Sequence, residues 1–477
     1  MAATSRRHDL VIIGGGVGGL VTASVAGQLG LDVVLIEREP NLGGDCLHYG
    51  CIPSKTLIRC AEIAHLARDA ERFGIRTDAV SVDLEKVMDR VREVIARIQP
   101  HDDPERFRGY GVDVRFGTAR FLDSHTVDVD GQAIAGRRFV IATGSRPVAP
   151  PVPGLDAVDY LTNETVFAEK RLPERLAVLG GGPIGLELAQ AFQRLGSQVT
   201  VLEMAPQVLP KEDPEIAASL HDALTAEGLD VRTGVTVGQV DGEVGQYRLH
   251  CQTGDQTDVV EADRLLVAAG RSPNVEALDL DRAGVISDRA GIRVDARMRT
   301  SARHIFACGD VCGPYPFTHM AEYQAGVIIA NAIFRFPKKA DYRVVPWVTY
   351  TAPEVAHVGL TEQQARDQGL TVQIARFPFG DVDRALAEGS ERGLAKLVVH
   401  KGRLAGASLV GPHAGELIHE LVLAMQARVK IGQIAAAIHA YPTLAQINRR
   451  AVNSLYSPKL FAPRTRRVVH WINRLLP

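Results

Sequence analysis

The sequence of 477 residues predicts an α/β protein with two Rossmann-like dinucleotide-binding domains. Two G-x-G-x-x-G fingerprints each follow a short β-branched strand and open a helix. Each is followed by a second strand that ends in a glutamate, 23 residues after the first glycine. The chain is also too long for one hydrophobic core, so we expect about three domains.

The bulk composition narrows the class of protein. An apolar content of 46% and a charged content of 23% are ordinary for a soluble globular chain, and a net charge of −2 argues against nucleic acid as a partner. No apolar stretch reaches the length of a membrane span. Few residues precede the first apolar run at 10–16, so no signal peptide is expected. These features predict a cytoplasmic protein, in which a close cysteine pair is more often catalytic than structural.

The first fingerprint lies in DLVIIGGGVGG, residues 9–19, and the helix after it is expected to run to about Gln28. Its glycines are Gly14, Gly16 and Gly19. They permit a tight turn, a close approach to a pyrophosphate and close helix packing, and the helix N-terminus faces the phosphates. Glu37 ends the next strand, where its carboxylate would accept from ribose hydroxyls. A purely structural tight turn is the alternative interpretation.

The second fingerprint repeats this pattern in LAVLGGGPIGLE, residues 176–187. Its glycines are Gly180, Gly182 and Gly185. Glu203 ends the following strand, and its carboxylate would pair with a 2′-hydroxyl and repel a 2′-phosphate. No arginine follows within 204–210, so NADH is favoured over NADPH. The alternative for Glu203 is a solvated strand end.

A cysteine pair stands in GGDCLHYGCIPSK, residues 43–55, at the start of a helical run. Cys46 and Cys51 would close a small disulfide ring across one helical turn. A structural disulfide is disfavoured because so short a loop constrains the unfolded chain little. A structural zinc site is disfavoured because it needs four ligands, and no metal site is predicted. The pair is therefore interpreted as a redox dithiol.

With these features in view, the chain resembles the pyridine nucleotide–disulfide oxidoreductases, the flavoprotein family of dihydrolipoamide dehydrogenase, glutathione reductase and mercuric reductase. The supporting stretches are ATGSRP at 142–147, AAGRSPN at 268–274, IFACGD at 305–310 and PWVTYTAPEVAHVGLTE at 346–362. The resemblance implies FAD in the first site and NAD(H) in the second.

The resemblance also implies roles for single residues. Asp310 would bind the flavin ribityl chain, and Lys55 and Glu187 would form a pair beside flavin N5. Further implied cofactor contacts are Gly44, Thr143, Gly144 and Gly270. Cys51 would lie nearer the flavin, and Cys46 would be the thiolate that meets the substrate, its pKa lowered by the nearby helix start. Cys308 and Cys312 are interpreted as small buried residues beside the cofactor.

A domain order follows from the resemblance. The expected segments are an FAD-binding domain at 1–150, an NAD-binding domain at 151–280, a return to the FAD domain at 281–345, and a C-terminal α+β dimerisation domain at 346–477. Independently, APPVPG at 149–154 is typical of a linker, and residues 80–98 have helical apolar spacing. Residues 111–140 alternate apolar and polar side chains, which predicts an antiparallel meander.

The chain departs from the family near its C-terminus. Thiol-handling members carry H-x-H-P-T, with a glutamate five residues after the second histidine, whereas this chain has HAYPTLAQ. Tyr441 therefore stands where the base is expected and Gln446 where its acid partner is expected. A phenol is a poor base at neutral pH, and His439 is the candidate substitute. Mercuric reductases resemble this chain in having a tyrosine there, but they carry a C-terminal cysteine pair that this chain lacks.

The resulting expectation is a homodimeric FAD enzyme that uses NADH, or makes it, through the dithiol of Cys46 and Cys51. The leading substrate is a small disulfide or dithiol, or a lipoyl protein, of the dihydrolipoamide kind. Glutathione reductase is disfavoured by Glu203 and by Pro183, which replaces a tyrosine lid. The alternatives are a reductase of mercuric or other thiophilic metal ions or of quinones, and a flavoprotein of low turnover with a docking role. The tail at 463–477 predicts a basic amphipathic helix that packs on its own dimer, with docking on a membrane or a partner as the alternative.

Overall fold

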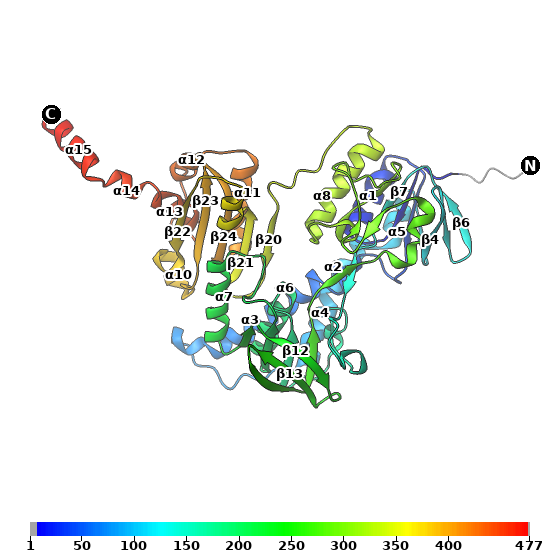
Figure 1. Cartoon of the computed structure of the whole chain (residues 1–477), viewed down its shortest axis with the longest axis horizontal. Coiled ribbons are helices and arrows are strands. Elements are labelled where there is room, and N and C mark those ends of the chain that lie inside the picture. Colours follow the sequence, from blue (N-terminus) through cyan, green and yellow to red (C-terminus); the bar gives the residue numbers. More distant parts are fainter. Residues whose placement is uncertain (1–6, 476–477) are drawn as a thin grey trace, which may run out of the picture.

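The computed structural model describes residues 7–475 and contains three large β-sheets with their covering helices (Figure 1). The first sheet is parallel and has the strand order β19-β7-β1-β2-β3. Its strands are β1 (Leu10–Ile13), β2 (Val33–Glu37), β3 (Val112–Phe116), β7 (Phe139–Ile141) and β19 (Ile305–Ala307). Strand β19 returns to this sheet although, in the sequence, it comes after all the strands of the second sheet.

The two faces of the first sheet are covered differently. Leu10 and Ile12 pack toward helices, whereas Val11 and Ile13 pack toward a small antiparallel sheet, as the twofold period of a strand requires. The covering helices are α1 (Val17–Gln28), α5 (Pro104–Gly109) and α8 (Thr318–Ile328). Helix α1 ends where the sequence predicts.

The meander prediction for residues 111–140 is correct only in its middle. Strands β4 (Ala119–Asp123), β5 (Thr126–Val129) and β6 (Gln132–Ala135) form an antiparallel meander. The two ends of the segment form β3 and β7, which pair in parallel with β2 and β1. All three residues of β7 are buried because helices cover one face of the sheet and the meander covers the other.

The second sheet is also parallel, with the order β11-β10-β9-β15. Its strands are β9 (Arg175–Leu179), β10 (Gln198–Glu203), β11 (Asp230–Thr233) and β15 (Arg264–Val267). One face packs on helices α3 (Cys51–Arg68), α4 (Leu84–Ile98), α6 (Pro183–Leu195) and α7 (Pro214–Ala226). The other face packs on the antiparallel strands β12 (Thr236–Asp241), β13 (Tyr247–Thr253) and β14 (Gln256–Ala262).

The third sheet is antiparallel, with the order β20-β21-β24-β23-β22, and the C-terminal part is α+β as predicted. Its strands are β20 (Pro346–Thr349), β21 (Glu354–Gly359), β22 (Val372–Pro378), β23 (Leu394–His400) and β24 (Arg403–Gly411). The helices of this part are α9 (Glu362–Asp367), α10 (Asp383–Glu388), α11 (Ala414–Gln426), α12 (Ile431–Ala436) and α13 (Gln446–Ser454).

The remaining elements connect the three sheets with their covering helices, or project from them. A two-stranded ribbon joins β8 (Ser145–Pro147) to β16 (Arg271–Pro273), a hairpin joins β17 (Ser287–Asp288) to β18 (Gly291–Ile292), and α2 (Gly44–His48) precedes α3. Helices α14 (Ser457–Leu460) and α15 (Pro463–Leu475) project from the third sheet (Figure 1). Residues 476 and 477 of the predicted tail helix lie outside the described residues. Within 7–475, no helix combines the length and apolarity needed to cross a membrane.

Candidate active site

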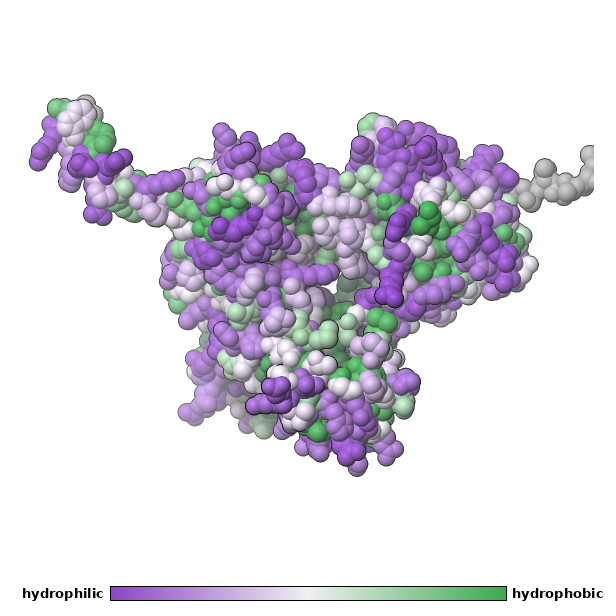
Figure 2. Space-filling model, viewed as in Figure 1, coloured by the Kyte–Doolittle hydropathy of each residue, from purple (hydrophilic) through white to green (hydrophobic). Residues whose placement is uncertain are grey.

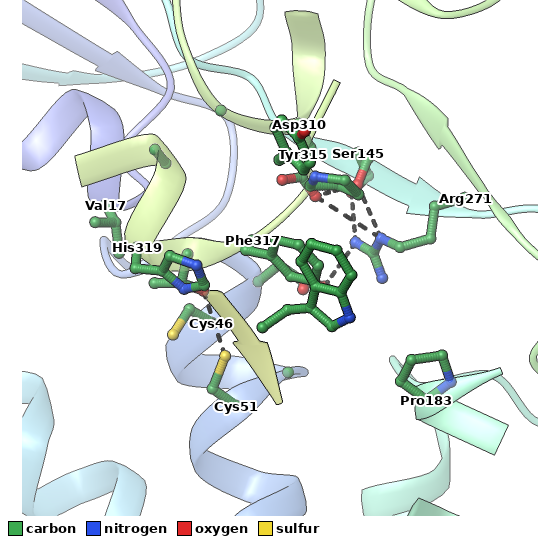
Figure 3. A pocket seen from close by; sticks show the side chains of 18 of the residues that line it. Val17, Cys46, Cys51, Ser145, Pro183, Arg271, Asp310, Tyr315, Phe317 and His319 are labelled. Carbon is green, nitrogen blue, oxygen red and sulfur yellow. Dashed lines mark hydrogen bonds and ion pairs between the residues drawn. The ribbon is translucent and has the colours of Figure 1, made fainter. Parts of the chain in front are cut away.

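A large cleft with a volume of about 3000 Å³ is lined by strands of the first and third sheets and by α6 and the loops next to the second sheet (Figure 3). The sequence-predicted residues that line it are Gly14, Gly16, Glu37, Gly44, Cys46, Cys51, Lys55, Thr143, Gly144, Gly182, Glu187 and Asp310. The predicted residues outside its lining are Gly19, Gly180, Gly185, Glu203, Gly270, His439 and Tyr441. The fold thus collects one site from segments that lie far apart in the sequence.

The cysteine pair spans a break between two helices. Cys46 lies in α2, and Cys51 is the first residue of α3. The predicted ring across one turn of a single helix is therefore wrong. Residues five apart on a continuous helix point about 140° away from each other. The break at Tyr49 and Gly50 instead brings both sulfur atoms together (Figure 3), and all six cysteines of the chain are free thiols.

The two thiols of the pair differ in pKa. A hydrogen bond from Cys46 lowers the pKa of Cys51 to about 6, assisted by the Thr318 hydroxyl at 3.3 Å and the charge of Lys55. The same hydrogen bond, together with burial, raises the pKa of Cys46 well above its usual range. The proton of the reduced pair therefore stays on Cys46. The expected lowering of the pKa of Cys46 by a helix start is wrong, because α3 begins at Cys51.

One ion pair joins the helix of the dithiol to the second nucleotide site. The Lys55 ammonium on α3 donates to Glu187 Oε2 on α6 at 2.7 Å. Glu187 is 5% exposed, and its Oε1 accepts the backbone N–H of Tyr350 at 2.8 Å. The Lys55 ammonium also lies 4.4 Å from the centre of the Tyr350 ring. One buried carboxylate therefore fixes the positions of α3, α6 and the end of β20.

The two glycine fingerprints adopt the same backbone geometry. Gly14 and Gly180 have φ angles of +108° and +114°, which favour glycine. A Cβ on Gly19 would lie 1.9 Å from the carbonyl oxygen of Gly14, and a Cβ on Gly185 would lie 1.9 Å from that of Gly180. The first and third glycines therefore serve the turn and the helix packing, which explains why the third ones do not line the cleft.

The glutamates that end β2 and β10 are also equivalent. Glu37 Oε2 accepts the backbone N–H of Gly15 at 2.6 Å, and Glu203 Oε2 accepts that of Gly181 at 2.6 Å. The Oε1 atoms accept the N–H two residues further on, at 2.8 Å and 2.7 Å. Each carboxylate is thereby held beside its glycine loop, where a ribose would lie.

Asp310 belongs to a polar network that the sequence analysis missed. Ser145 Oγ donates to Asp310 Oδ2 at 2.6 Å, and Arg271 Nε donates to Ser145 Oγ at 2.8 Å (Figure 3). The guanidinium also lies 3.2 Å from Asp45, beside the dithiol. Burial raises the pKa of Asp310. Both Ser145 and Arg271 occur in stretches quoted for the family resemblance, so the signal was present without an assigned role.

A second missed feature is a buried acid beside an aromatic wall of the cleft. Trp347 Nε1–H donates to Glu212 Oε1, and the pKa of Glu212 is raised to about 7 because the carboxyl is buried. Its Oε2 has no hydrogen-bond partner within the described residues. His357 packs on Trp347 at 4.4 Å between ring centres, and burial lowers its pKa to about 4. The Trp347 ring also stacks on Phe317 at 6.2 Å.

Comparison with known proteins identifies the family. Residues 8–325 match the model of the pyridine nucleotide-disulphide oxidoreductases, and residues 345–452 match the model of their dimerisation domain. The chain belongs to this family. As an oxidoreductase with this dimerisation domain, it is supported as a homodimer.

Several relatives of this oxidoreductase have names that record different substrates. The chain is 37% identical to a mercuric reductase of Staphylococcus aureus over 442 residues, which is 92% of this chain and 81% of the relative. It is 38% identical to a dihydrolipoyl dehydrogenase of Thermus scotoductus over 485 aligned residues, which is 98% of this chain and the whole relative. A solved structure described as the Cu(II) complex of the HOCl-induced flavoprotein disulfide reductase RclA from Escherichia coli is 29% identical, with a TM-score of 0.84. That match covers 93% of this chain and 99% of RclA.

FAD and NAD(P)H are the cofactors of this oxidoreductase family, and both fingerprint cradles fit a dinucleotide. The middle glycines leave the room that a pyrophosphate needs. A Cβ on Gly16 would meet only Gly44 at 3.9 Å, and a Cβ on Gly182 would meet nothing within 4 Å. Helices α1 and α6 begin directly after these glycines and present their N-terminal N–H groups there.

The candidate bases of this oxidoreductase lie away from the cleft of the same protomer. The Tyr441 side chain is 70% exposed, and a hydrogen bond to Asp383 raises its pKa. The His439 ring contacts Glu420 Oε1 at 2.9 Å and is largely buried. Gln446 Nε2 donates to the carbonyl oxygens of His439 and Ala440 at 3.2 Å, so it braces this loop.

Proposed function

We propose that this oxidoreductase uses NADH to reduce a thiophilic metal ion, Hg(II) in the first instance, held by Cys46 and Cys51. The observation that carries the proposal is the high pKa of Cys46 together with Tyr441 at the position of the base. Thiol–disulfide exchange needs the Cys46 proton removed before attack, and a phenol is a poor base for that step. A thiophilic metal ion displaces the thiol proton as it binds.

The electron balance of the reaction is simple. NADH loses two electrons and one proton to become NAD⁺, and Hg(II) gains two electrons to become Hg(0). Bound FAD supplies the relay between the nicotinamide and the metal-bearing dithiol. Two thiolates satisfy a soft metal ion in linear coordination. Cys46 and Cys51 both line the open cleft, so a substrate ion can reach the pair and leave it again.

The chain's own groups have separate roles in this scheme. We place FAD at the first fingerprint and NADH at the second. Lys55, held by Glu187, keeps a positive charge beside the place where reduction puts negative charge. Glu203 accepts the ribose hydroxyl and repels a 2′-phosphate, which favours NADH. Thr318 and Cys46 hydrogen-bond Cys51 and keep it ionised.

The second candidate is a reductase or oxidase of small disulfides and dithiols of the dihydrolipoamide kind. Its specific support is the 2.9 Å contact between His439 and Glu420, because a histidine held by a carboxylate is the arrangement of a general base. In a dimer that brings this loop to the partner's dithiol, His439 would replace the missing histidine. The relative named dihydrolipoyl dehydrogenase is in keeping with this candidate.

The deciding experiment is anaerobic NADH oxidation by the holoenzyme with Hg(II), lipoamide and glutathione disulfide as separate acceptors. Wild type, Tyr441→His, His439→Asn and Cys46→Ala are compared. We expect wild type to turn over Hg(II) with little lipoamide activity, and Tyr441→His to gain lipoamide activity. Cys46→Ala should lose turnover with Hg(II).

Two other outcomes of this experiment would contradict the metal proposal. Strong lipoamide turnover by wild type that falls in His439→Asn would overturn the metal proposal in favour of the dithiol one. If NADH bleaches the flavin only slowly and no acceptor is reduced, the third hypothesis of a docking flavoprotein holds. The intact Lys55–Glu187 pair argues against that outcome.

A further inference from the structure

The C-terminal helix α15 contributes no residue to the lining of the cleft, and none of its described side chains is buried against the rest of the protomer. It begins at Pro463, beyond the end of the matched dimerisation domain at residue 452. Figure 1 shows it projecting from the body past α13 and α14. None of the side chains of Pro463–Leu475 is buried, and Trp471 is 65% exposed. The apolar side chains of α15 are therefore exposed to solvent in the protomer.

The apolar residues of α15 form one face. They follow the spacing i, i+3, i+4 and i+7, which aligns side chains along one side of a helix. These residues are Val468, Trp471, Ile472 and Leu475. The opposite face carries Arg466, Arg467, His470, Asn473 and Arg474. Figure 2 shows both hydrophobic and hydrophilic side chains on this projecting segment.

The C-terminal segment that ends in α15 carries positive charge without any acidic residue. Residues 421–477 contain nine Lys and Arg and no Asp or Glu, although the whole chain has a net charge of −2. Within 7–475 no ion pair is formed by the side chains of Arg464, Arg466, Arg467 or Arg474. The positive charge of α15 is thus left available for an anionic surface.

We propose that α15 binds the surface of an anionic phospholipid bilayer, with its axis in the interfacial plane and the Val468–Leu475 face in the acyl boundary. Thirteen helical residues extend about 20 Å, too short to span a bilayer core of about 30 Å, so the helix lies on the surface. Tryptophan prefers the interface, and arginines draw the helix to anionic headgroups. A second copy of α15 would cover the apolar face but would leave the arginines of the opposite face without an anionic partner.

A homodimer strengthens such an anchor. One short amphipathic helix binds a membrane weakly and reversibly, but two helices on one dimer bind together with an increased effective concentration. The proposal is independent of the substrate, because α15 stands apart from the cleft. The dimer would thus associate reversibly with a membrane surface through its two copies of α15.

The test is vesicle flotation of the FAD-loaded full chain. We expect it to float with vesicles of phosphatidylcholine and phosphatidylglycerol, and to bind at least about tenfold more weakly to phosphatidylcholine alone or in high salt. A chain truncated after Tyr456 should stay at the bottom. Arg466→Glu with Arg467→Glu and Arg474→Glu should also lose binding. Unchanged circular dichroism and flavin absorbance show that these variants are folded.

Fluorescence gives an independent readout, because the chain contains only two tryptophans, Trp347 and Trp471. A blue shift on adding anionic vesicles should appear in the full chain and vanish in Trp471→Phe, which keeps an apolar side chain and should still float. The proposal fails if the truncated chain floats equally well. It also fails if Trp471 emission is already blue-shifted without vesicles and truncation converts the dimer to a monomer, since the helix then packs on its own dimer.

Discussion

The Lys55 ammonium lies 2.7 Å from the Glu187 carboxylate and joins α3, which carries Cys51, to α6, which follows the second glycine fingerprint. The two residues are 132 positions apart, and the carboxylate is buried while the ammonium reaches the cleft. Glu187 also accepts the backbone N–H of Tyr350, so the pair is tied to the third sheet, and the charge of Lys55 helps to lower the pKa of Cys51.

Replacing Lys55 by Met should leave the buried Glu187 carboxylate without its partner. We expect the free energy of unfolding to fall by about 2 kcal/mol, less than for a fully buried pair because Lys55 is partly exposed. Lys55→Arg keeps the charge and should lose less. Denaturant unfolding measures both, and stopped-flow bleaching of the flavin by NADH should slow in the Met variant. Equal stability of the Met variant and wild type would contradict the structural role.

Cys46→Ala should raise the pKa of Cys51, because it removes the hydrogen bond that contributes most to lowering that pKa. The alkylation rate of Cys51 by iodoacetamide, followed by peptide mass spectrometry from pH 5 to pH 9, should have its midpoint near pH 6 in reduced wild type. In Cys46→Ala the midpoint should move upward by about one unit or more. Cys46→Ser is the matched control, since its hydroxyl still donates and should move the midpoint less. An unchanged midpoint in all three would mean that Cys46 does not tune Cys51.

Glu212 gives the folded protein a pH dependence. Its folded pKa of about 7 lies above its ordinary value of 4.5, so the folded state holds more protons between these values and stability falls as pH rises through this window. The full effect is about 3 kcal/mol. Glu212→Gln, which still accepts from Trp347, should flatten the dependence of unfolding free energy between pH 5 and pH 8. A slope identical to that of wild type would show that Glu212 is ionised in the fold.

Glu203→Gln should relax the choice of nicotinamide, because it removes the negative charge that repels a 2′-phosphate but keeps an oxygen for the Gly181 N–H. We expect the ratio of kcat/KM for NADPH to that for NADH to rise about tenfold. Glu37→Gln, the equivalent change at the other fingerprint, should leave this ratio unchanged. If both variants change the ratio equally, the two sites have been assigned wrongly.

The sequence predicted those features that depend on the spacing of residues close together in the chain. The glycine fingerprints and the helix after Gly16 depend on residues a few positions apart, and the structure forms them where the pattern indicates. The apolar–polar alternation at 111–140 predicts the meander correctly only in its middle, because the two ends of the segment pair in parallel with strands distant in the sequence. The Lys55–Glu187 contact was expected only through the family resemblance, since nothing local joins residues 132 positions apart.

The missed features depend on contacts that no local pattern records. Arg271 reaches Ser145 across 126 residues, and Trp347 reaches Glu212 across 135. The break between Cys46 and Cys51 was also missed, because a Tyr-Gly step inside an apparent helical run is a weak breaker. Its effect on the two pKa values follows only from the geometry.

The order of the strands also has a consequence for synthesis on the ribosome. Strands β1, β2, β3 and β7 emerge early, but their sheet waits for β19, which follows the entire second sheet. Residues 175–267 are therefore complete and free to fold while the first nucleotide cradle still lacks an edge strand and Asp310. In a nascent chain arrested before residue 305, the second sheet would be complete, whereas the first sheet would still lack its edge strand β19. The first dinucleotide site is therefore completed only when the last third of the chain is being translated.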